Sequence, residues 1–185
     1  MKAAKLLNFV MYEAGWLACV VGAAWGAGCY GAALAGVLVV VHISLATAWF
    51  QELRLVLAAM LTGCLVDGLC IWFGVLRFAD AGAIPGLPPF WMTVLWMQFA
   101  TTLRYSLSWL RGRFLLAALF GLLGAPAAFC GGARLGAVEL PGPAVPGLLL
   151  LGILWSAAMP LLVWLSGRSG ADAVVAGYRL GRCRS

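Results

Sequence analysis

Four ionisable side chains lie inside long apolar segments of this 185-residue chain: Glu13, His42, Asp67 and Arg104. An ionisable group at membrane depth is costly and therefore marks a candidate functional site. A glutamate or a histidine can act as a general base, and a guanidinium can hold a phosphate through charge-assisted hydrogen bonds. These residue types make Glu13, His42 and Arg104 the candidate catalytic residues.

A second set of polar side chains is expected to bind rather than to react. Asp67 lies near the middle of its apolar segment, where a carboxyl group can carry a proton. In the next apolar segment, Gln98, Thr101 and Tyr105 recur on one side at helical spacing. We expect Asp67 to face the interior of the protein. The structural alternative is that it only accepts hydrogen bonds from Gln98 or from the threonines of that segment.

The elements that must position these side chains are membrane-spanning helices. Hydrophobic residues make up 64% of the chain, charged residues only 10%, and the mean hydropathy is +1.02. Soluble domains are about 25% charged, so this composition excludes a soluble globular domain, a disordered chain and a secreted disulfide scaffold. A bilayer core needs about 20 apolar residues per helix. The sequence therefore predicts an all-α integral membrane bundle of six transmembrane helices, at Leu6–Trp25, Ala27–Trp49, Leu53–Leu76, Pro88–Leu110, Phe114–Gly131 and Val145–Ser166.

These helices form a single expected domain over residues 1–166, followed by a basic tail over residues 167–185. With the N-terminus in the cytoplasm, all twelve Lys and Arg residues except Arg77 and Arg134 fall on the cytoplasmic side. Positive charge is concentrated in cytoplasmic loops, so both termini are expected there. Contact with anionic lipid headgroups also accounts for the net charge of +6, and no nucleic-acid partner is expected.

Depth along the helices predicts a specific ion pair. Glu13, His42 and Arg104 each lie roughly 10 Å from the cytoplasmic end of their segments. An unpaired charge at that depth costs several kcal/mol, so Glu13 and Arg104 are expected within hydrogen-bonding reach. The alternatives are that this pair only fixes helix register, that Arg104 reaches the headgroups, and that His42 is a satisfied interior histidine.

Metal and cofactor chemistry is not expected. His42 is the only histidine, and the six cysteines contain no CxxC pair. Motifs for serine hydrolases, zinc peptidases and nucleotide binding are absent from the sequence. Cys29 and Cys130 both fall near the outer face, and their spacing leaves a disulfide between them open.

Several short motifs stand out along the chain: Asn8 with Gly15–Val20, then His42, Glu52 and Asp67, then Trp96–Leu103 with Ser106–Leu107 and Trp109–Leu110, and finally Gly132–Gly136. Together these motifs resemble a family of small bacterial inner-membrane proteins of unknown function. Genes of that family often lie near cyclopropane-fatty-acid-synthase-like methyltransferases and other lipid-modifying enzymes. The resemblance implies a multi-pass protein of the bacterial inner membrane, with membrane lipids and a lipid-modifying enzyme as partners. It assigns no catalytic residue.

Three functions follow as hypotheses. The first is an accessory or cofactor-free factor in the modification of membrane lipids and their acyl chains. The second is a small proton-coupled or solute transporter centred on Asp67. The third is a structural or scaffolding membrane protein without a site. A cavity that opens to the cytoplasm or the inner leaflet would favour the first, a cavity across the midplane the second, and no cavity the third.

Overall fold

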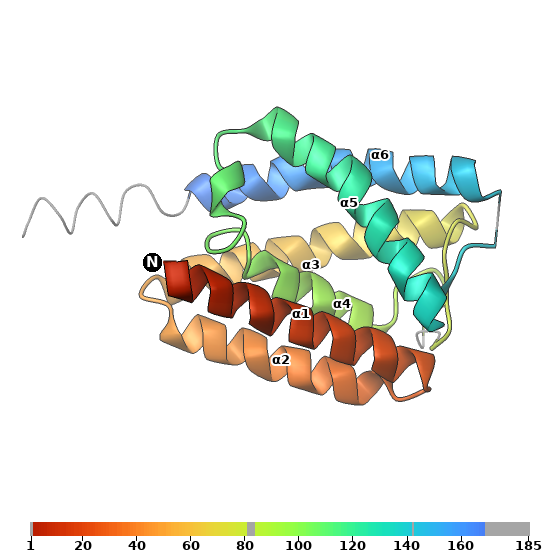
Figure 1. The fold of residues 1–185 in the computed structure, drawn as a ribbon, viewed down its shortest axis with the longest axis horizontal. Coiled ribbons are helices and arrows are strands. Elements are labelled where there is room, and N and C mark those ends of the chain that lie inside the picture. Colours follow the sequence, from red (N-terminus) through yellow and green to blue (C-terminus); the bar gives the residue numbers. More distant parts are fainter. Residues whose placement is uncertain (1, 81–83, 142, 169–185) are drawn as a thin grey trace, which may run out of the picture.

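The computed structural model of the chain is built almost entirely from helices (Figure 1) and describes residues 2–80, 84–141 and 143–168. Its six α-helices are α1 (Lys2–Ala24), α2 (Gly28–Leu45), α3 (Trp49–Trp72), α4 (Phe90–Ala100), α5 (Phe114–Leu135) and α6 (Ala144–Arg168). Five of them, all but α4, are long and apolar enough to cross a membrane. The chain is therefore a multi-pass helical membrane protein. The predicted tail at 167–185 lies outside the described residues, apart from its first two, which α6 includes.

The predicted fourth span requires a correction. The α-helix begins at Phe90 but ends at Ala100, not at Leu110, and is about 17 Å long, which is shorter than a bilayer core of ~30 Å. Six full spans are therefore not confirmed. Turns follow the helix, and a short 3₁₀ helix occupies Ser108–Leu110.

Hydrogen bonds from α1 hold the segment in which α4 stops. The hydroxyl groups of Thr101 and Thr102 each donate to the carbonyl oxygen three residues earlier, at 2.7 Å. Ser156 makes the same kind of bond inside α6, which continues, so these bonds alone do not end a helix. Asn8 of α1 donates from Nδ2 to the carbonyl oxygen of Thr101, and its Oδ1 accepts from the hydroxyl of Ser106 at 2.9 Å. The segment after α4 is therefore held by α1 instead of continuing as a helix.

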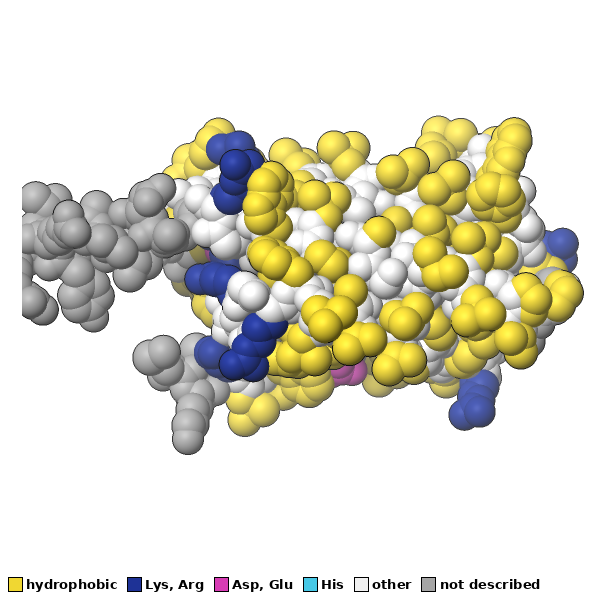
Figure 2. Space-filling model, turned by 90° about the horizontal axis from the view of Figure 1, so that it is seen from above, with side chains coloured by type: hydrophobic (Ala, Val, Ile, Leu, Met, Phe, Trp, Pro, Cys, Tyr) yellow, Lys and Arg dark blue, Asp and Glu magenta, His cyan; other side chains and the backbone are white. Residues whose placement is uncertain are grey.

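The long helices lie roughly side by side, and α5 runs obliquely across the bundle (Figure 1). The most extensive pairings join α5 with α6 and α1 with α2, while α4 packs against both α2 and α3. Apolar side chains cover much of the outer face seen in Figure 2, and a group of Lys and Arg side chains lies at one end. This "basic end" carries the exposed side chains of Lys5, Arg54, Arg111, Arg113 and Arg168.

The opposite end is closed by a small strand pair. β1 (Arg77–Phe78) and β2 (Val138–Glu139) are antiparallel, and Arg77 donates from Nη1 to Oε2 of Glu139 at 3.2 Å. Gly136 precedes β2 with a φ of 89°, a left-handed conformation that ends α5 and that other residues rarely adopt. The pair ties the α3–α4 connection to the α5–α6 connection.

Candidate functional site

Four side chains near the basic end form a largely buried group that we call the Glu52 cluster: His42, Glu52, Arg104 and Tyr105. Arg104 donates from Nη1 to Oε1 of Glu52 at 3.0 Å. Nε2 of His42 lies 3.6 Å from the other carboxylate oxygen, and its ring packs edge-on against that of Tyr105 with centroids 4.9 Å apart. The exposed fractions of the three charged side chains are 11% for His42, 4% for Glu52 and 9% for Arg104.

A helical hairpin brings His42 and Glu52 together. His42 lies three residues before the end of α2, and Glu52 lies three residues after the start of α3. Because the two helices run in opposite directions, both side chains have the same depth. The C-terminal carbonyl groups of α2 favour a cation, and the N-terminal amides of α3 favour an anion. His42 therefore lies at a helix end that favours positive charge, and Glu52 lies at a helix end that favours negative charge.

The expected pair of Glu13 and Arg104 is wrong. The carboxylate partner of Arg104 is Glu52, and Glu13 is exposed on another side of α1. The buried face of α1 carries Asn8 and Gly15, both packed against the segment of α4 and its following turn. At 3.6 residues per turn, Glu13 points well away from that face. Equal depth in two helices does not imply that their side chains face each other.

Asp67 faces the interior as predicted, but its hydrogen-bond donor is neither Gln98 nor a threonine. It is fully buried, and its Oδ2 accepts a hydrogen bond from the indole Nε1 of Trp96 at 2.8 Å. Gly63, one turn earlier on α3, leaves the room that the indole ring occupies, since a Cβ there would overlap the ring. The polar side chains of α4 and its following turn bond elsewhere: Gln98 donates to the carbonyl oxygen of Met11, and Thr101 donates to that of Gln98.

The predicted site residues thus separate into three places. His42, Arg104 and Tyr105 belong to the Glu52 cluster, whereas Asp67, Gln98 and Thr101 lie in the interior around α4. Glu13 stands apart from both. Glu52 is absent from the site predicted from the sequence, because it lies one residue before the predicted third span, which begins at Leu53. The short connection between His42 and Glu52 was the signal that could have revealed it.

A groove opens on the other side of the segment that follows α4, with a volume of about 320 Å³. We call it the lateral groove. Its walls come from α1, α5, the Phe99–Leu107 segment and one residue of α6: Phe9, Tyr12, Glu13, Trp16, Phe99, Thr102, Ser106, Leu107, Phe120, Gly121, Gly124, Ala125, Ala128 and Trp155. Most of these residues are apolar. Phe9 and Phe120 at its rim are 48% and 39% exposed, so the groove opens at the membrane-facing surface.

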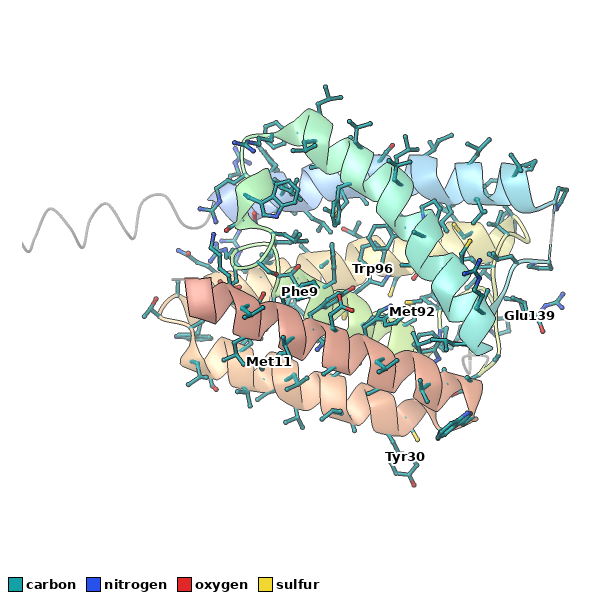
Figure 3. The ribbon with its side chains drawn as sticks, viewed as in Figure 1. Phe9, Met11, Tyr30, Met92, Trp96 and Glu139 are labelled. Atoms are coloured by element: carbon teal, nitrogen blue, oxygen red, sulfur yellow. The ribbon has the colours of Figure 1, made fainter. Side chains whose placement is uncertain are left out.

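A smaller cavity of about 60 Å³ extends this groove toward the strand pair. The two share Tyr12, Trp16, Phe99, Ala128 and Trp155 as walls. The smaller one also reaches Met92 and Trp96 of α4, which lie in the interior of the bundle in Figure 3. Asp67 lines neither cavity.

The remaining chemistry of the described residues is sparse. No group of three His, Cys, Asp or Glu side chains that could hold a metal ion occurs among them. Cys29 and Cys130 are both free, so the disulfide left open by their spacing is not formed.

Fold and site together define a multi-pass helical membrane protein with a buried charged cluster at one end and a membrane-facing groove beside it. The family model described as "Protein of unknown function (DUF2878)" matches residues 5–161, which span all six helices in whole or in part. The chain belongs to this family. No curated protein and no solved structure matches it.

Proposed function

We propose that the protein is a lipid-associated membrane protein whose lateral groove takes one acyl chain from the cytoplasmic leaflet. The observation that carries this proposal is the groove itself: apolar, open at the membrane-facing surface, and ending near the basic end. Lys5 lies at that end and donates to the hydroxyl of Ser108 at 2.9 Å. The exposed cations there suit the anionic headgroups of a cytoplasmic leaflet.

The length of the groove supports an acyl chain as the occupant. From Phe120 to Gly132 along α5, the groove and its smaller extension cover about 18 Å. One leaflet contributes roughly half of a bilayer core of ~30 Å, or about 15 Å. Phe120 lies about 9 Å beyond Phe114, the first residue of α5, so a chain that fills both cavities from the basic end extends past the midplane toward the strand pair.

This placement supports a role as an accessory or cofactor-free factor that presents an acyl chain to a lipid-modifying enzyme of the bacterial inner membrane. Glu13 is the one carboxylate among the residues that line the groove, so it is the acidic group that a bound chain would meet. Transport has less support. Asp67 is fully buried, bonded to Trp96, and lines neither cavity.

The proposal is tested by a substitution that fills the lateral groove with a bulky side chain. Gly124 has open space where a side chain would project, with only the ring of Phe120 nearby at 3.8 Å. Gly124→Phe should therefore occupy the groove without displacing backbone. Leu123→Phe is the matched control, because Leu123 is the next residue along α5 and its own side chain is 69% exposed on the lipid-facing surface.

The assay is photocrosslinking in vesicles that contain phosphatidylglycerol with a diazirine on one acyl chain. We expect crosslinks in the wild type to concentrate on groove residues, and Gly124→Phe to remove most of them, because its ring fills the space that the acyl chain would occupy. Leu123→Phe should keep the wild-type pattern. Crosslinks spread evenly over all lipid-facing helices would contradict the proposal. Unchanged acyl and headgroup profiles in a deletion strain, at rest and under oxidative stress, would argue against a role in lipid modification.

A further inference from the structure

The guanidinium of Arg104 uses only one of its nitrogens in the Glu52 cluster. Nη1 bonds to Glu52, whereas Nε and Nη2 are buried and have no acceptor among the described residues. Nε and Nη2 form the edge with which arginine holds a carboxylate or a phosphate through two parallel hydrogen bonds. The side chain is only 9% exposed, so bulk water contributes little to these two donors. Leaving buried donors unpaired is unfavourable, and the free edge therefore suits an oxyanion.

His42 and Glu52 indicate which oxyanion fits. Nε2 of His42 and Oε2 of Glu52 are also buried and make no hydrogen bond in the described part of the chain. A ligand carboxylate would offer only acceptors and would be repelled by the free oxygen of Glu52. A singly protonated phosphate offers acceptors to Arg104 and His42, and its P–OH can donate to Glu52. We propose that the Glu52 cluster binds a phosphate group, held by the Nε–Nη2 edge of Arg104 with His42 and Glu52 beside it.

Access is from the basic end. His42 and Arg104 each keep a small exposed fraction, and the ring that covers His42 is that of Tyr105, which is itself only partly buried. Rotation of the Tyr105 side chain would remove its contact with the His42 ring. Thr102 and Ser106 of the same segment line the lateral groove instead. The phosphate site is therefore separate from the groove and does not rest on the proposed acyl-chain function.

The phosphate can come from a free anion or from a lipid headgroup, and two probes distinguish these sources. The full chain, isotope-labelled at arginine Nε, is titrated in maltoside micelles with inorganic phosphate and, separately, with short-chain phosphatidic acid. The titration is run at about pH 5, where a phosphate monoester with a second pKa of about 6 is still largely protonated once. Sodium chloride at matched ionic strength is the control. We expect a saturable shift of the Arg104 Nε–H resonance and no such shift for the exposed Arg77.

Arg104→Lys keeps the charge but loses the paired donors, so its affinity should fall about tenfold or more. His42→Gln should weaken binding less. If phosphatidic acid saturates the site at a concentration at least about tenfold below inorganic phosphate, the source is a lipid headgroup; similar concentrations indicate the free anion. No saturable shift of the wild-type resonance with either probe, or an equal shift with chloride, overturns the proposal. This wild-type criterion holds even if Arg104→Lys does not fold.

Discussion

Removal of the Glu52 carboxylate should destabilise the protein strongly, because it leaves a buried guanidinium without its counter-charge. Glu52 and Arg104 are 4% and 9% exposed and 3.0 Å apart, so solvent screens their interaction little. Breaking a buried pair by removing one partner costs about 3–5 kcal/mol, and we expect Glu52→Gln to lie near the lower end because the amide still accepts one hydrogen bond. Glu13→Gln, at an exposed position, should change stability by less than about 0.5 kcal/mol.

The assay is reversible unfolding of the purified protein in mixed SDS–maltoside micelles, with a double-mutant cycle on Glu52→Gln and Arg104→Met. The double variant should be more stable than the sum of the single losses implies, with a coupling energy of about 1–3 kcal/mol. Arg77→Met, at the exposed pair on the opposite end, should show little loss, since exposed pairs contribute about 0–1 kcal/mol. Equal effects of Glu52→Gln and Glu13→Gln, or additivity across the cycle, would refute the assignment of Glu52 as the partner of Arg104.

Three further outcomes are expected. Gly63→Ala should lower unfolding stability by about 1–3 kcal/mol, because its Cβ overlaps the Trp96 ring; wild-type stability would show that the ring shifts freely. Trp96→Phe should lower the free energy of unfolding by about 1–3 kcal/mol beyond the loss of ring contacts, because Asp67 loses its only hydrogen bond in the described structure. Trp91→Phe removes an indole N–H that has no partner there, so it should lose only the ring contacts. A reporter fused in the loop at 111–113 should be active only on the cytoplasmic side, and activity outside would reverse the proposed topology.

The apolar helices could be predicted from the sequence because length and hydropathy are local properties. The fourth span was overextended, since hydropathy does not record that Asn8, far away in sequence, forms hydrogen bonds with the segment that follows Ala100. An apolar run of sufficient length therefore predicts membrane depth, but it does not guarantee a continuous α-helix.

The candidate site could be predicted only in part. The depth of each residue along its apolar segment identifies His42 and Arg104 as candidates, and the two do lie in one cluster. The direction of each side chain around its helix depends on which helices are neighbours, and the sequence does not state that. The sequence therefore does not show that Glu13 points away from Arg104, or that Glu52, at a span boundary, faces it. The inward direction of Asp67 could be predicted, because Gly63 and Cys70 share its face of α3 at helical spacing and small residues mark the side on which membrane helices pack.

The strand pair that joins Arg77–Phe78 to Val138–Glu139 also determines how the molecule can flex. It fastens α5 to the rest of the bundle at one end, beside the left-handed turn at Gly136. At the basic end, a turn rather than a strand pair leads into α5 at Phe114. A tilt of α5 about the strand pair, against its packing on α6, is the movement that would open the groove. The same small rotation would then widen the entrance near Phe120 more than the inner end near Gly132, so that a ligand would be admitted and released from one side.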